Sequence, residues 1–176
     1  MSATDDAIRR ALAAHSDEAM WSLIHDQTVC FWVDWREVDQ AIVEYCEIIL
    51  QTGKLSAEIV DEDDEHGFEM FIQFGQRRVK VPLVIGVEDR HITVHTLNQL
   101  LLPDLEIRYV LASNGNDGAA FLPLSSNSWK QLENEFPAEV EHNFLKIESS
   151  LNLFTEIVPL PQSRQPKKMK WWQFWS

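Results

Sequence analysis

The sequence predicts an α+β fold, in which helices pack on a mostly antiparallel sheet of about five or six strands. Strand-like and helix-like segments follow one another without a regular β–α–β order. Two polar stretches that contain glycine, DEDDEHG at 61–67 and NGNDG at 114–118, separate strand-like runs as hairpin turns do. We expect a single domain over residues 1–157, followed by an extended tail over residues 158–176.

Two short helices and a strand are expected first. Thr4 precedes an amphipathic run that ends near residue 15, and Ser16 begins a second run of one or two helical turns. The segment TVCFWVDW at 28–35 is rich in β-branched and aromatic residues, which favour strands.

The clearest helix follows this strand. Asp34 and Glu37 have the spacing of a capping box, and Gly53 is placed to end the helix. Its apolar residues cover more than one face, which is typical of a helix packed between two other elements.

The centre of the chain predicts three strands and one ambiguous segment. Residues 55–60 and 68–74 alternate and form a hairpin, and residues 77–86 add a strand in which Pro82 marks an edge or an end. Residues 88–103 contain both strand-like alternation and helix-like leucine spacing.

The last elements are a hairpin and two helices. Strands are expected at 105–113 and 119–125. Ser125, Ser126 or Ser128 then caps a helix that runs to Phe136, and the final helix covers 138–151.

The charge distribution limits the classes of partner. The chain has 15 basic and 28 acidic side chains and a net charge of −13, and residues 1–163 alone carry −17. This body repels nucleic-acid phosphates and attracts basic proteins. It shows neither an N-terminal signal peptide nor an apolar run of membrane-spanning length, so we expect a cytoplasmic protein without stable membrane insertion.

Motifs for catalysis are missing from the sequence. It has neither a phosphate-binding glycine loop nor a G-x-S-x-G elbow. Cys30 and Cys46 lie in apolar runs, which favours buried free thiols. We therefore expect a non-enzymatic protein with no catalytic residue and no cofactor.

A metal site is not expected, although two features resemble one. His91 and His95 are spaced i, i+4, as two ligands on one helical face would be, and a metal-dependent hydrolase that uses them is one alternative function. The DEDDEHG stretch resembles a calcium loop but has His66 where that loop requires glycine.

The tail ends in KKMKWWQFWS, which is basic and aromatic, unlike the acidic body. It can fold back on its own domain, dock on another protein or on a second copy of the chain, or lie at a membrane interface. The candidate binding residues of the tail are Lys167, Lys168, Lys170, Trp171, Trp172, Phe174 and Trp175.

The functional hypothesis is an acidic protein-binding module. In its sharper form it is an inhibitor of the immunity or antitoxin type, which neutralises a basic toxin or nuclease by charge complementarity. The alternative outside catalysis is an adaptor that docks through the tail. The candidate residues of the acidic loop are Asp61, Glu62, Asp63, Asp64 and Glu65.

Overall fold

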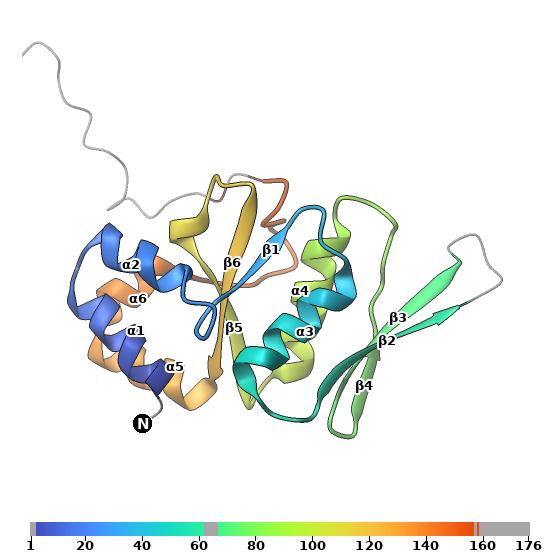
Figure 1. Cartoon of the computed structure of the whole chain (residues 1–176), viewed down its shortest axis with the longest axis horizontal. Coiled ribbons are helices and arrows are strands. Elements are labelled where there is room, and N and C mark those ends of the chain that lie inside the picture. The colour runs from blue at the N-terminus through green and yellow to red at the C-terminus, as the bar shows by residue number, and fades with distance from the viewer. Residues whose placement is uncertain (1–2, 62–66, 157, 159–176) are drawn as a thin grey trace, which may run out of the picture.

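The computed structural model describes residues 3–61, 67–156 and 158 of the chain. Within them the fold is α+β, with six helices and seven strands, and both of its sheets are antiparallel (Figure 1). The helices are α1 (Ala3–Ala13), α2 (Asp17–Ile24), α3 (Asp39–Leu50), α4 (Asp89–Leu101), α5 (Ser126–Glu135) and α6 (Pro137–Asn143). The strands are β1 (Phe31–Asp34), β2 (Leu55–Asp61), β3 (Phe68–Phe74), β4 (Arg77–Lys80), β5 (Leu105–Val110), β6 (Gly118–Ser125) and β7 (Phe144–Lys146).

The strands divide between two sheets. The larger sheet has the order β1–β6–β5–β7, and the smaller one has the order β2–β3–β4. The predicted α+β class and the antiparallel pairing are confirmed, including both hairpins. The sequence predicted about five or six strands in one sheet. Alternation identifies strands but does not say which strands share a sheet.

The larger sheet is covered on both faces (Figure 1). Buried residues of α3, α4 and the smaller sheet form one cluster against it, which we call the inter-sheet core. Residues of α1, α2, α5 and α6 form a second cluster on the opposite face, the outer-helix core. Along β6, Ala119 and Phe121 belong to the inter-sheet core, whereas Ala120 and Leu122 belong to the outer-helix core. This alternation follows from the two-residue period of a strand.

Helix α3 lies between the two sheets, as its apolar pattern predicted. Its capping differs from the prediction. The helix begins at Asp39 with Val38 as N-cap, and no side chain caps it. Asp34 instead accepts a hydrogen bond from the backbone N–H of Arg36 at 2.8 Å, so it stabilises the turn before the helix. The helix ends at Leu50 with Gln51 as its left-handed C-cap at φ 50°, and Gly53, which is also left-handed at φ 64°, lies two residues further on.

The ambiguous segment 88–103 forms helix α4. Its buried positions lie on several sides and include polar residues, so neither of the two simple periodicities describes it. The Asp39 carboxylate at the start of α3 accepts hydrogen bonds from Arg90 and, at 2.8 Å, from the Thr93 hydroxyl. The two inner helices are therefore joined by polar contacts as well as by the core.

The final predicted helix is shorter than expected. Helix α5 begins after Ser125, whose hydroxyl accepts from the Ser128 N–H at 2.9 Å, as predicted. Helix α6 ends at Asn143, and residues 144–146 form β7 instead of continuing the helix. Strand β7 pairs with the free edge of β5, and this long-range pairing overrides the local helical pattern.

A buried arginine connects the larger sheet to α5. Arg108 of β5 is 3% exposed, and its guanidinium lies 4.2 Å from the centre of the Trp129 ring. It donates to Glu106 at 2.8 and 3.2 Å and to Glu133 of α5 at 2.7 Å. A buried cation is tolerated because these two carboxylates neutralise it.

We expect Arg108→Ala to lower the free energy of unfolding by about 3 kcal/mol, because it leaves the half-buried Glu106 carboxylate without its cation and removes the packing on Trp129. Urea unfolding followed by circular dichroism measures the change. The exposed Arg10→Ala should change it by no more than about 0.5 kcal/mol. Equal losses in the two variants would contradict the role given to Arg108.

Candidate protein-binding surface

The predicted acidic loop connects the two long strands of the smaller sheet. Strands β2 and β3 form a hairpin that extends away from the helices (Figure 1). Asp61 is the last residue of β2, is exposed, and pairs with Phe68, the first residue of β3. The other four candidate residues, Glu62, Asp63, Asp64 and Glu65, lie outside the described residues.

Two large apolar side chains are exposed beside Asp61. Ile59 pairs with Met70, and Asp61 pairs with Phe68, so Ile59 and Phe68 lie on the same face of the hairpin. Nearer the helices, this face carries Met70 and Ile72, which are fully buried in the inter-sheet core. The apolar face therefore continues beyond the core to the end of the hairpin.

The connection between β4 and α4 carries three more exposed aliphatic residues, one of which adjoins this end of the hairpin. Val84, Ile85 and Val87 are all exposed, and Ile85 lines a cavity of about 70 Å³ together with Phe68. We call the five residues of this surface the hairpin-end patch; their exposed fractions range from 40% to 67%. Its members are Ile59, Phe68, Val84, Ile85 and Val87.

The conformation of this connection is held by a buried carboxylate. Asp89, in the first turn of α4, is 6% exposed. One of its oxygens accepts from the Val84 N–H at 2.8 Å, and the other accepts from the Gly86 N–H at 3.0 Å. Between these two anchors Ile85 has φ 58°, in the left-handed region that a β-branched residue rarely adopts. Backbone strain of this kind is concentrated at functional sites.

Basic residues on the outer face of the smaller sheet are paired with its own carboxylates. Arg78 contacts Glu58 at 2.8 Å, and its guanidinium lies 3.7 Å from the centre of the Phe71 ring. Lys80 forms an ion pair with Glu69. These strand cations are therefore engaged in pairs within the sheet.

Local sequence did not predict Val84, Ile85 and Val87 as surface residues. One strand was predicted over 77–86, with Pro82 as its edge or end, and β4 does end at Lys80, two residues before this proline. Gly86 was a further signal, since glycine commonly interrupts strands. The anchoring by Asp89 has no sequence signature.

The two predicted metal ligands occupy α4. The ring centroids of His91 and His95 are 6.2 Å apart, and the Nε2–H of His91 donates to the Glu148 carbonyl oxygen at 3.0 Å. One ring nitrogen of His91 is thus already used in the fold. In the described part of the chain, no group of three or more His, Cys, Asp or Glu residues could hold a metal ion.

The two cysteines are buried free thiols, as predicted. Burial raises the pKa of the Cys30 and Cys46 thiols well above the ordinary value, with smaller contributions from nearby carboxylates. A thiol of this kind is a poor nucleophile at neutral pH, because the thiolate is the reactive form.

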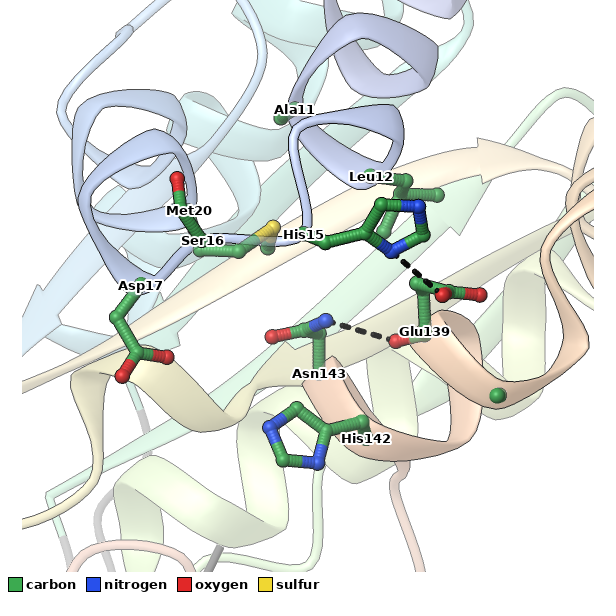
Figure 2. A pocket seen from close by; sticks show the side chains of 10 residues that line it. Ala11, Leu12, His15, Ser16, Asp17, Met20, Glu139, His142 and Asn143 are labelled. Atoms are coloured by element: carbon green, nitrogen blue, oxygen red, sulfur yellow. Dashed lines mark hydrogen bonds and ion pairs between the residues drawn. The ribbon is translucent and has the colours of Figure 1, made fainter. Parts of the chain in front are cut away.

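A separate cavity of about 250 Å³ lies between the α1–α2 junction and α6 (Figure 2). His15 Nδ1 contacts a Glu139 carboxylate oxygen at 2.7 Å, and Asn143 donates to the Glu139 carbonyl oxygen at 2.8 Å. His142 and Asp17 also line it. The His15–Glu139 contact joins the first helices to α6, and the sequence analysis singled out neither residue.

The binding residues predicted in the tail lie outside the described residues, so their prediction stays untested. Among the described residues, no helix is long and apolar enough to cross a membrane. Comparisons of the chain with protein-family models, curated proteins and solved structures found no match.

His91 makes the stability pH-dependent. Burial lowers its pKa in the fold, so the unfolded chain binds a proton more readily below about pH 6.5. Neutral His91 therefore contributes fully to the free energy of unfolding above that pH. This contribution is lost as the pH falls, because protonation of His91 favours the unfolded chain. His91→Gln should therefore lose less unfolding free energy than the wild type between about pH 7 and about pH 5, measured by urea unfolding.

We expect Ile85→Gly to leave the free energy of unfolding unchanged or to raise it by about 1 kcal/mol, because glycine adopts a positive φ without strain. Val84→Gly serves as the control, since Val84 has no positive φ, and it should lower the free energy by about 0.5–1 kcal/mol. Thermal and urea unfolding measure both. Equal destabilisation of the two variants would show that Ile85 is not strained.

Proposed function

We propose that the chain is a non-enzymatic, acidic protein-binding module that binds a basic partner through the hairpin-end patch and the adjoining acidic loop, residues 61–65. The observation that carries the proposal is the exposure of apolar side chains beside the acidic loop: Ile59 and Phe68 share a face of the hairpin with Asp61, and Ile85 lines a cavity with Phe68. Apolar anchors surrounded by charge are the usual composition of a protein interface.

The hairpin-end patch supplies the apolar centre of this interface. Monomeric proteins expose isolated apolar residues commonly, but a contiguous group is typical of a contact surface. The Asp89 carboxylate holds Val84 and Gly86 in place before any partner arrives. A preformed loop loses little conformational entropy on binding, which favours affinity.

The acidic loop supplies charge complementarity. The net charge of −13 attracts a basic protein over several ångströms and speeds its encounter. The neighbouring strand cation Arg78 is paired with Glu58 of the same sheet. Five successive carboxylates also match the several phosphate-binding positions of a basic groove.

The finer form of the proposal is an inhibitor of the immunity or antitoxin type. In this form the partner is a basic toxin or a nuclease, and the acidic loop occupies its phosphate-binding cleft. The burial of both thiols supports a role in binding rather than in nucleophilic catalysis.

The test compares three immobilised full-length baits in native lysate: the wild type, a loop variant and a charge-matched control. The loop variant is Asp61→Asn, Glu62→Gln, Asp63→Asn, Asp64→Asn and Glu65→Gln. The control removes five exposed carboxylates elsewhere, namely Glu18→Gln, Glu44→Gln, Asp117→Asn, Glu141→Gln and Glu148→Gln. Quantitative mass spectrometry should find basic proteins on the wild type and the control, at least about tenfold depleted on the loop variant.

Salt and patch variants complete this test. Bound basic proteins should elute as ionic strength rises from about 0.1 M to about 1 M, since exposed charges are screened. Phe68→Ala and Ile85→Ala should each weaken binding of the same proteins by about tenfold, mainly through faster dissociation. Equal loss of basic proteins from the loop variant and the charge-matched control would reduce the effect to net charge and overturn the proposal.

A further inference from the structure

Strand β1 is an edge strand with an unpaired side. It occupies one end of the order β1–β6–β5–β7 and pairs only with β6 among the described residues. Phe31 and Val33 belong to the inter-sheet core, whereas Cys30 and Trp32 belong to the outer-helix core. The open edge thus lies between the two cores, and the backbone groups that point away from β6 have no strand partner there.

A groove of about 440 Å³ follows this edge. It is lined by Phe31 and Trp32, whose side chains point to opposite faces of the sheet, so it must lie along the strand edge that separates those faces. The opposite wall is α3, with Tyr45, Ile48 and Ile49. Ile48 is 64% exposed, which is unusual for an isoleucine in a helix that otherwise packs between two sheets.

Two carboxylates also belong to the lining of the groove. Asp34 and Glu37 both line it. Glu37 accepts a hydrogen bond from the Tyr45 hydroxyl at 3.1 Å, and burial together with this acidic neighbour raises the pKa of Tyr45. The groove therefore combines aromatic and aliphatic walls, a free strand edge and acidic side chains. It suits an extended segment that carries aromatic rings and cations.

We infer that this groove is the docking site for residues 167–176 of the same chain, the segment KKMKWWQFWS. In this arrangement the aromatic residues of the segment pack on Trp32, Tyr45 and Ile48, and its lysines approach Asp34 and Glu37. The inference concerns a surface separate from the hairpin-end patch and does not depend on the proposed partner.

The segment can reach the groove. Val158 is buried, and its carbonyl oxygen accepts from the Asn114 side chain at 3.1 Å. Asn114 lies four residues before Gly118, which pairs with Asp34 of β1, so Val158 is within roughly 25 Å of the groove. The nine residues from Val158 to Lys167 span up to about 30 Å when extended.

Charge and tethering favour the chain's own segment over that of a second copy. Residues 164–176 carry four basic and no acidic side chains, whereas residues 1–163 carry a net charge of −17. Docking on a second copy would bring two acidic bodies together, and these repel each other. A segment tethered to its own chain meets the groove at an effective concentration in the millimolar range. A second cavity, of about 450 Å³, lies nearer Val158, but turn residues 113–118 form much of its lining, and it is the competing location in the test.

Paramagnetic relaxation measured by NMR on the full-length chain tests the inference. Ser176→Cys carries the spin label, while Cys30 and Cys46 are buried and stay unlabelled. We expect strong broadening of the backbone amides at 31–34 and 45–49 and little at 113–118. A mixture of spin-labelled, isotope-free chains with label-free, isotope-enriched chains should show no broadening. Broadening of the same amides in the mixture would assign the groove to a second copy, and broadening centred on 113–118 or spread evenly would also overturn the inference.

A matched pair of variants, one on α3 and one at its N-cap, provides the control. Ile48→Lys places a cation in the groove, whereas Val38→Lys places one outside it, and both wild-type residues are 64% exposed. Ile48→Lys should abolish the broadening at 31–34, and Val38→Lys should preserve it. Both variants should keep the wild-type melting temperature within a few degrees. Broadening that survives Ile48→Lys would overturn the inference.

Discussion

Burial of the larger sheet on both faces is the constraint on which the rest of the structure depends. An antiparallel sheet commonly leaves one face in water, but here β5 and β6 send alternate residues into two cores. Ile107 and Tyr109 enter the inter-sheet core, whereas Val110 enters the outer-helix core. Arg108 points toward the outer helices, where Trp129, Glu106 and Glu133 surround it. A central strand of this kind has no solvent-facing side to offer a ligand.

Surfaces for recognition are therefore found at the edges of the fold. The smaller sheet is covered on one face only, and its apolar face continues past the last buried residues to Ile59 and Phe68. The larger sheet ends at β1, where a groove follows the open edge. Edge strands invite pairing by further chain segments, and natural proteins usually cover or charge them. Both candidate surfaces are consequences of where the two cores end.

Much of this architecture could be predicted from local sequence, and its failures have identifiable causes. The hairpin at 55–74 was predictable because alternation and a polar turn agree in one short segment. Residues 144–146 were not, because their strand forms only by pairing with β5, some 35 residues away. Helix α4 was ambiguous because two sheets bury it from several sides, which removes the amphipathic period. The hairpin-end patch depends on hydrogen bonds from Asp89 to two backbone amides, which residue types alone do not reveal.

The two proposed interactions respond differently to salt, although the same acidic body supports both. At the hairpin end the interaction begins with exposed carboxylates, and such charges are screened within about 10 Å at 0.1 M ionic strength. In the β1 groove, Trp32 is half-buried and Ile48 is exposed, so apolar contact contributes a larger share and is strengthened rather than screened by many salts. Moderate salt should then release a basic partner while the tail stays bound. Four of the chain's 15 basic residues lie in the tail, so its docking makes the electrostatic potential at β1 less negative. The acidic loop then remains as a separate site that attracts basic proteins.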